Sequence, residues 1–397
     1  MMDVRFMLAR LPPPQVGRNA RQRGDSSVHC RENPNALYMA TRASSSLLSQ
    51  VVGEAIKREA ADIIFSFETV PCLKIDGRLE HLITLSPLTD SDLKEIVTEI
   101  LPASKVQELG EKRQVDLAYA QAEARFRVNV FYQRGHLSVV MRYIRSHIRT
   151  IDELGLPLLV RELVANDSGL ILLVGPTGSG KSSTLAAMIE EINATQEKHI
   201  ITIEDPIEYL YKNKLSVIQQ REVGLDAISF GAALRSTLRE APDVILLGEM
   251  RDLESISAAV TVAETGHLVL STIHANTAPG TVDRIIDSFP EGSKEQIRIQ
   301  LADILVGVLN QRLVPKADGS GSQLVVEVML ANSAVRNTIR TGNSAQLPTV
   351  IQTSAGEGMC LLDDELVKAV KRGDVMREVA LDYAIDRTGM HKALLSA

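Results

Sequence analysis

The pattern of hydrophobic and polar positions divides the chain into segments with different periods. Residues 45–145 mix short alternating stretches with amphipathic helical ones, which predicts a compact α+β domain. Residues 146–158 have neither period and are interpreted as a linker. Residues 159–330 alternate short apolar runs with helical segments, a pattern typical of a parallel α/β sheet. Residues 331–397 are mainly helical in period, so we expect an α/β protein with a smaller N-terminal domain and a helical C-terminal region.

The first 44 residues fit none of these patterns. The stretch LPPPQVGRNARQRGDSS is rich in Pro, Arg, Gly and Ser and has no helical or strand periodicity. Residues 1–44 are therefore predicted to be disordered, or to be an extension that is not translated. Met39 lies just before the first periodic segment, and we expect it to be the physiological start.

Composition narrows the class of protein. Hydrophobic residues make up 45% of the chain and charged residues 23%, which is ordinary for a water-soluble protein. No apolar run approaches the roughly 20 residues that span a bilayer, and the N-terminus lacks the layout of a signal peptide, so a cytoplasmic protein is expected. The net charge of −7, the absence of tryptophan and the lack of a long basic run argue against a nucleic-acid partner.

The three cysteines are Cys30, Cys72 and Cys360, and they lie far apart. Three cysteines cannot supply the four ligands of a structural zinc site, and no CxxC is present. We interpret them as reduced structural thiols.

A phosphate-binding loop is the most specific motif. The sequence GPTGSGKS matches GxxxxGK[ST], with an apolar strand before it and a helix after it. Backbone N–H groups of such a loop and of the helix N-terminus bind phosphate oxygens. Lys181 is expected to contact the β- and γ-phosphates, and Ser182 is expected to hold Mg²⁺. The residues expected to bind ATP are Gly175, Pro176, Thr177, Gly178, Ser179, Gly180, Lys181, Ser182 and Ser183.

Acidic residues follow two further strands. Ligands of open α/β sheets bind beyond the carboxyl ends of the strands. Glu204 lies at the carboxyl end of the predicted strand in HIITIEDP, and Glu249 lies at that of the predicted strand in VILLGEMRD. Asp243 precedes its apolar run and belongs at the opposite end, so Glu249 is expected to contact Mg²⁺ directly or through water. Both glutamates are candidates for activating the attacking water, and Glu204 is favoured because it is free of the metal.

Two histidines flank the apolar run in GHLVLSTIHANT. Seven residues of strand separate His267 from His274 by roughly 23 Å, too far for both to bind one metal ion. His274 is expected at the phosphate end, where it senses the γ-phosphate or relays its loss to Asn276. His267 is expected to make a structural hydrogen bond.

Four motifs in this order resemble those of the secretion-type ATPases. The phosphate loop, TIEDPIEY, VILLGEMRD and GHLVLSTIHANT correspond to that family's Walker A, Asp, Walker B and His boxes. Within the family, AVRNTIRTGN (residues 334–343) is similar to an element of the PilT- and PilU-type pilus retraction ATPases. Assembly ATPases generally carry a four-cysteine zinc element, which these cysteines cannot form.

The resemblance implies a RecA-like P-loop ATPase domain, a PAS-like N-terminal domain and a homohexameric ring. It points to Arg125, Arg127 and Arg142 as the arginines that reach the γ-phosphate of a neighbouring subunit. It further implies ATP hydrolysis with Mg²⁺ that powers pilus retraction and twitching motility at the cytoplasmic face of the inner membrane. The implied partners are an inner-membrane platform protein, which alone links the motor to the membrane, and a paralogous pilus ATPase.

Some sequence features remain open. Helical AVRNTIRTGN fits a subunit or partner contact and an ordinary amphipathic surface helix equally well. Arg235 and Arg239 are spaced one helical turn apart and are candidates for a subunit contact. An assembly ATPase of a pilus or type II secretion system, a nucleic-acid-translocating ring ATPase and a non-hydrolysing scaffold are the alternative functions.

Overall fold

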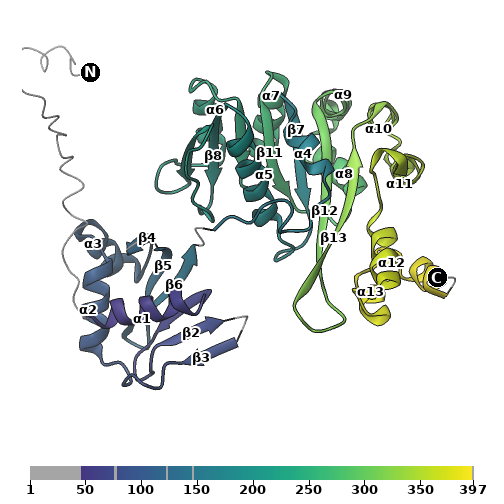
Figure 1. Ribbon diagram of the computed structural model, residues 1–397. Coiled ribbons are helices and arrows are strands. Elements are labelled where there is room, and N and C mark those ends of the chain that lie inside the picture. Colours follow the sequence, from purple (N-terminus) through teal and green to yellow (C-terminus); the bar gives the residue numbers. More distant parts are fainter. Residues whose placement is uncertain (1–45, 76–77, 122–123, 145–146, 396–397) are drawn as a thin grey trace, which may run out of the picture. The chain divides into compact units, whose positions relative to one another are not determined.

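A computed structural model describes most of the chain, namely residues 46–75, 78–121, 124–144 and 147–395 (Figure 1). The segment 1–44, the proposed start Met39 and Cys30 lie outside the described residues. No helix in the described ranges is both long enough and apolar enough to cross a membrane.

The N-terminal part is built on a six-stranded antiparallel sheet with the order β3-β2-β1-β6-β5-β4. Its strands are β1 (Asp62–Phe65), β2 (Cys72–Ile75), β3 (Arg78–His81), β4 (Gln114–Gln121), β5 (Ala124–Gln133) and β6 (His136–Ile144). Its helices are α1 (Leu47–Lys57), α2 (Asp90–Ile100) and α3 (Ala103–Lys112). Helix α2 begins where Thr89 and Asp92 form a capping box, and it packs against β6.

Strand β5 has the alternation that its sequence predicts. Phe126, Val128 and Val130 are fully buried, whereas Arg127 on the other face is exposed. The apolar face of the strand therefore belongs to the core of this part, and the arginine face is free for polar contacts.

The larger part is built on a seven-stranded sheet with the order β13-β12-β7-β11-β10-β8-β9. Its strands are β7 (Gly169–Val174), β8 (His199–Glu204), β9 (Val217–Glu222), β10 (Val244–Leu247), β11 (Leu268–Ile273), β12 (Leu305–Pro315) and β13 (Ser322–Leu330). Its helices are α4 (Leu159–Val164), α5 (Lys181–Thr195), α6 (Phe230–Thr237), α7 (Leu253–Glu264), α8 (Ala278–Asp287) and α9 (Lys294–Ile304).

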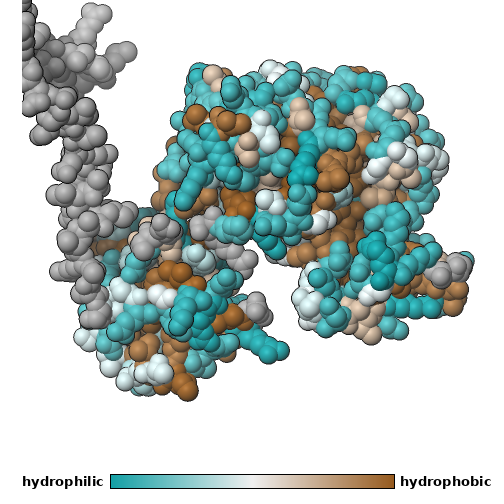
Figure 2. Space-filling model, in the orientation of Figure 1, coloured by the Kyte–Doolittle hydropathy of each residue, from teal (hydrophilic) through white to brown (hydrophobic). Residues whose placement is uncertain are grey.

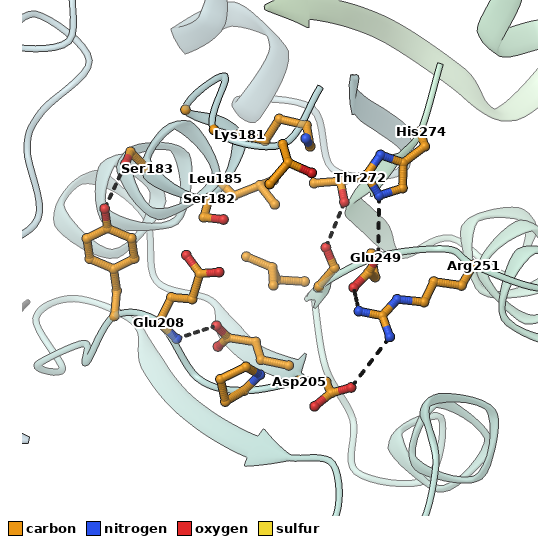
Figure 3. A pocket seen from close by; sticks show the side chains of 18 of the residues that line it. Lys181, Ser182, Ser183, Leu185, Asp205, Glu208, Glu249, Arg251, Thr272 and His274 are labelled. Atoms are coloured by element: carbon orange, nitrogen blue, oxygen red, sulfur yellow. Dashed lines mark hydrogen bonds and ion pairs between the residues drawn. The ribbon is translucent and has the colours of Figure 1, made fainter. Parts of the chain in front are cut away.

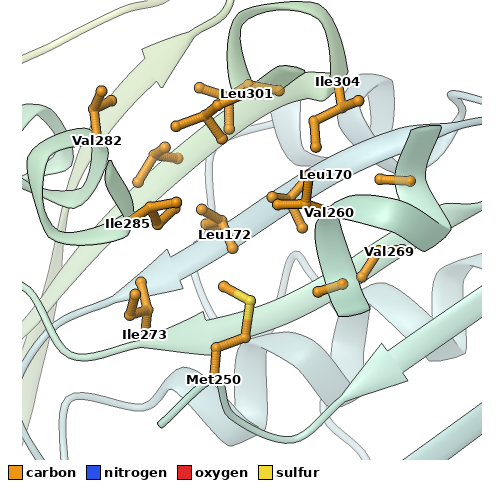
Figure 4. Packing of buried hydrophobic residues seen from close by; sticks show 14 of the residues in the cluster. Leu170, Leu172, Met250, Val260, Val269, Ile273, Val282, Ile285, Leu301 and Ile304 are labelled. Carbon is orange, nitrogen blue, oxygen red and sulfur yellow. The ribbon is translucent and has the colours of Figure 1, made fainter. Parts of the chain in front are cut away.

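Alternate residues of the central strands enter two separate cores. In β7, Leu170 and Leu172 pack with α7, α8 and α9 on one face, while Ile171 and Leu173 pack with α4 and α5 on the other. Figure 4 shows the first core, with side chains of β7, β11 and the helices meeting over the sheet. Burial on both faces explains why these strands have continuous apolar runs.

The prediction of a parallel sheet is correct for six strands and wrong for β13. This edge strand runs antiparallel to β12, with which it pairs from Gly307↔Leu330 to Pro315↔Ser322. The short loop of residues 316–321 joins the two strands directly, so no crossover helix is present to make them parallel. On the visible face, hydrophobic side chains gather where β12 and β13 run, between more hydrophilic surfaces (Figure 2).

The C-terminal region is helical, as its period predicts. It contains α10 (Ser333–Arg340), α11 (Leu347–Thr353), α12 (Leu362–Arg372), α13 (Arg377–Tyr383) and α14 (Arg387–Leu395). Leu362, Leu366 and Met390 pack against Val314 and Val325, so α12 and α14 cover the far end of the β12–β13 hairpin.

The arginines of α10 are used inside the chain. Arg336 donates to the carbonyl groups of Ala302 and Leu305 at the end of α9, and Arg340 forms an ion pair with Asp303. These bonds satisfy carbonyl groups that a helix end leaves unpaired. The AVRNTIRTGN element thus holds α9 and α10 together.

Candidate active site

The carboxyl ends of the central strands lie level with one another. Val174 at the end of β7 pairs with Ile273 of β11, and Leu247 at the end of β10 pairs with Ile203 of β8. The next residues along these strands line one pocket, which includes Lys181, Ser182, Glu204, Glu249 and His274 (Figure 3). Three of the predicted boxes therefore meet at the phosphate loop, as their order along the strands predicts.

The phosphate loop requires glycine for steric reasons. Gly175 has a φ of +137°, and a Cβ atom there would lie 2.5 Å from the carbonyl oxygen of Gln311. Gly178 and Gly180 also have positive φ values, of 80° and 90°, and a Cβ atom at Gly178 would meet no atom within 4 Å. The loop thus presents backbone at its surface, which is the shape that phosphate binding requires.

The N-terminus of α5 completes this cradle. Gly180 is the N-cap residue and provides no side-chain hydrogen bond to the first turn of the helix. The first N–H groups of α5 and the positive end of its dipole are thereby left for an anion. Ser179 Oγ is buried and lacks a hydrogen-bond partner among the described residues.

Lys181 contacts the loop that precedes it. Its Nζ donates to the carbonyl oxygens of Gly175 and Pro176, each at 2.9 Å. Burial lowers the pKa of Lys181, and the negative charge of Glu249 opposes this effect. The hydroxyl groups of Ser183 and Tyr209 are 2.7 Å apart, so Ser183 has a partner on the segment after β8.

Glu204 is held at the end of β8 by three donors. Its Oε1 accepts from Thr202 Oγ1 at 2.6 Å and from Gln220 Nε2 at 3.3 Å, and its Oε2 accepts from the Glu208 N–H at 3.4 Å. The residue is only 8% exposed. Burial raises the pKa of Glu204, and the hydrogen bonds from Thr202 and Gln220 lower it.

Glu249 lies among basic groups. Arg251 forms an ion pair with Glu249 and lies 3.8 Å from Asp205, measured from Nη1 to Oδ2. His274 Nε2 lies 3.8 Å from Glu249 Oε2. Sequence reasoning missed Arg251, although its place two residues after Glu249 at a strand end was a usable signal.

The opposite end of the sheet holds the two residues that were assigned there. Asp243 precedes β10, and its Oδ2 accepts from the backbone N–H of His199, the first residue of β8. His267 precedes β11, where its Nδ1 lies 3.1 Å from Thr265 Oγ1 and 3.2 Å from the carbonyl oxygen of Val262. The structural role predicted for His267 is confirmed.

The three predicted arginines of the N-terminal part lie on adjacent strands. Arg127 on β5 is paired in register with Arg142 on β6, and Arg125 lies two residues before Arg127 on the same face. Arg142 Nε donates to Asp62 Oδ1 at 2.8 Å, and both Arg127 and Arg142 are exposed. The strand register therefore places the three arginines close to one another on the sheet.

The prediction that Arg235 and Arg239 lie one turn apart on a helix is wrong, whereas their part in a subunit contact stays a prediction. Helix α6 ends at Thr237, so Arg239 lies beyond it, and Arg235 forms an ion pair with Glu254 at 2.7 Å.

The donor groups in the pocket fit Mg²⁺ and a nucleotide. Ser182 and Glu249 supply the oxygen atoms that Mg²⁺ prefers, and a Mg²⁺ ion in phosphate sites needs only one or two protein ligands. Among the described residues no group of three or more His, Cys, Asp or Glu side chains is arranged to hold a metal alone. Cys72 and Cys360 are free thiols.

Comparison with known proteins identifies the family. The profile of the type II/IV secretion system proteins matches residues 41–379. The chain belongs to this family of ATPases. It is 40% identical to the type IV pilus retraction ATPase PilT of Pseudomonas aeruginosa, over 85% of this chain and 98% of that protein. It is 38% identical to the type IV pilus ATPase PilU of the same organism, over 83% of this chain and 86% of that protein.

A solved structure of this family is also similar to the chain. A crystal structure of the pilus retraction motor PilT with bound ADP has a TM-score of 0.83 and a sequence identity of 42%, and the match covers 88% of this chain and 100% of that chain. Two relatives at about 40% identity are thus a pilus retraction ATPase and a pilus retraction motor.

Proposed function

We propose that this protein is an ATP-hydrolysing motor that drives the retraction of type IV pili. The observation that carries this proposal is the pocket itself, in which Lys181 of a glycine-lined phosphate loop lies with Glu249 and His274 at the ends of neighbouring strands. The 40% identity to a pilus retraction ATPase over 85% of the chain supports the mechanical task.

Each group in the pocket has a proposed part in ATP hydrolysis. Backbone N–H groups of Gly175–Ser183 bind the phosphates of ATP, and Lys181 exchanges its bonds to the loop carbonyl groups for bonds to the β- and γ-phosphates. Ser182 and Glu249 hold Mg²⁺, which neutralises phosphate charge when bound. Glu204 orients and deprotonates the attacking water, because its carboxylate is fixed by three donors and no basic side chain among the described residues pairs with it. His274 contacts the γ-phosphate.

The proposed motor is a homohexamer at the cytoplasmic face of the inner membrane. Its RecA-like domain holds the nucleotide, and its PAS-like N-terminal domain supplies Arg125, Arg127 and Arg142 to the site of a neighbouring subunit. Movement of the domains is passed to an inner-membrane platform protein, from which pilin subunits are withdrawn. A paralogous pilus ATPase is the second proposed partner.

Purified protein and a gene replacement test this proposal together. Wild-type protein should hydrolyse ATP with Mg²⁺, and Lys181→Ala should reduce turnover at least about a thousandfold because the phosphates lose their main cation. Cells that carry Lys181→Ala should be hyperpiliated and unable to twitch. Bald cells would instead indicate an assembly ATPase, and stimulation of turnover by single-stranded DNA, with steep salt dependence, would indicate a nucleic-acid translocase.

A further inference from the structure

Strand β12 carries three consecutive polar side chains inside the protein. Asn310 and Gln311 are fully buried and Arg312 is 9% exposed. Buried polar groups cost free energy unless they are hydrogen-bonded. Asn310 pairs in register with Val174, the residue directly before the phosphate loop. The polar run therefore lies beside the proposed ATP site.

One face of β12 contacts the phosphate loop and the helix that follows it. Gln311 Nε2 donates to Thr184 Oγ1 of α5 at 2.8 Å. The carbonyl oxygen of Gln311 lies directly against Gly175, and it accepts from Arg312 Nη1 at 3.1 Å. The position of the strand and that of the phosphate loop are thus fixed to each other.

The other face of β12 contacts the loop that carries His274. The carbonyl oxygen of Asn276 accepts from Asn310 Nδ2 at 2.9 Å and from Arg312 Nη2 at 3.0 Å. Arg312 Nη1 also donates to Asn310 Oδ1 at 3.0 Å, which fixes the two side chains together. Asn276 lies only two residues after His274, so its carbonyl group sets where the loop leaves strand β11.

A buried carboxylate from β13 closes the cluster. Glu327 Oε2 accepts from Asn310 Nδ2 at 2.7 Å and from the backbone N–H of Ala278, the first residue of α8, at 2.8 Å. Glu327 is 2% exposed. The loop is consequently held on both sides of Thr277, at the Asn276 carbonyl group by β12 and at the Ala278 N–H group by β13.

We propose that Asn310, Arg312 and Glu327 form a positioning cluster that keeps His274 in register with the phosphate loop. These residues do not touch the nucleotide in this proposal and act through the His274 loop. The inference rests on the proposed ATP hydrolysis. Since a guanidinium group binds three acceptors in fixed directions, a lysine at position 312 keeps the charge but cannot reproduce the geometry.

The test compares Arg312→Lys with the wild type and combines it with His274→Ala. Arg312→Lys should lower kcat at least about tenfold, as expected for lost hydrogen bonds to a charged group, and change the KM for ATP less than about threefold. A fluorescent ADP analogue should bind with unchanged affinity. In the His274→Ala background, Arg312→Lys should change kcat by less than about twofold, because residues that act through one group are not additive.

Arg336→Lys is the matched control. Arg336 also donates to several backbone carbonyl groups, but these belong to Ala302, Asp303 and Leu305 around the end of α9. This variant should lose stability and keep its kcat. If Arg312→Lys does not fold, Asn310→Ser takes its place in the same comparison. The shorter serine side chain cannot form the hydrogen bond to the carbonyl oxygen of Asn276.

The outcomes separate the two proposals. Wild-type protein without ATPase activity would refute the proposed function. If the wild-type protein is active but Arg312→Lys leaves kcat unchanged, the positioning cluster alone is overturned. The same conclusion follows if the fold losses in kcat caused by Arg312→Lys and by His274→Ala multiply in the double variant.

Discussion

Thr202 Oγ1 donates a hydrogen bond of 2.6 Å to Glu204 Oε1, two residues further along the same strand. Both side chains lie on one face of β8 because residues i and i+2 of a strand share a face. Burial raises the pKa of Glu204, and this bond is the largest of the effects that lower it. Thr202 therefore helps to keep the proposed base ionised.

Thr202→Val should move the acid limb of the pH–activity profile to higher pH. A general base must be deprotonated, so kcat/KM falls as pH drops through the pKa of Glu204. Loss of the Thr202 bond raises that pKa, and the fall then begins at higher pH. The measurement is kcat/KM for ATP between pH 5 and pH 9. Thr237→Val, a buried threonine whose hydroxyl bonds within α6, should leave the profile in place. Superimposable profiles for Thr202→Val and wild type would refute the role of Glu204 as base.

The sequence predicts those parts of the site that depend on local order. The phosphate loop, Glu204, Glu249 and His274 each follow an apolar run, and parallel strands place such residues at one edge. The same rule assigns Asp243 and His267 to the far edge, and the structure agrees. The ends of strands can be predicted from the sequence because the run of apolar residues stops there and polar residues follow.

Contacts between distant segments could not be predicted in this way. Gln220 reaches Glu204 only because β9 lies beside β8, and Glu327 reaches Ala278 across 49 positions of the chain. The antiparallel pairing of β13 with β12 is different, because only the six residues KADGSG separate the two strands and so short a connection was a usable signal in the sequence. The contacts made by Gln220 and Glu327 depend on strand order and side-chain geometry. The periodicity of hydrophobic positions along the chain carries no information on either.

Gly175→Ala should destabilise the protein more than Gly224→Ala. Both glycines have positive φ, which costs a non-glycine residue roughly 1–2 kcal/mol, but only at Gly175 would a Cβ atom meet a backbone oxygen. The overpacking should add about 1–3 kcal/mol to the loss in free energy of unfolding. Urea denaturation of the two variants measures the difference. Equal losses would show that the loop moves away from β12 at no cost.

Glu249→Gln should raise the Mg²⁺ concentration needed for half-maximal ATPase activity at least about tenfold, since the amide lacks the charge that binds the ion. Asp243→Asn is the matched control, because Asp243 precedes the same strand and its amide variant keeps an acceptor for the His199 N–H. A titration of activity with MgCl₂ at fixed ATP measures both. A larger effect for Asp243→Asn would reverse the assignment of the two acids.

Arg127 offers a test of the proposed contact between subunits. It is exposed on β5, whereas its neighbour Arg142 is engaged with Asp62. Arg127→Ala and Lys181→Ala homohexamers should each be inactive. A mixture of the two should regain about a quarter of wild-type turnover, because in a closed ring an intact Lys181 then meets an intact Arg127 at some junctions.

The mixing experiment distinguishes action in trans from action in cis. Each subunit of the mixture lacks one of the two groups, so a site built within one subunit would remain inactive at every mixing ratio. Arg78→Ala, a change at an exposed arginine on the edge strand β3 of the same sheet, should be active without mixing. Turnover is measured after subunit exchange over a range of ratios, and a maximum at equal amounts of the two variants is expected for an arginine that acts on the neighbouring site.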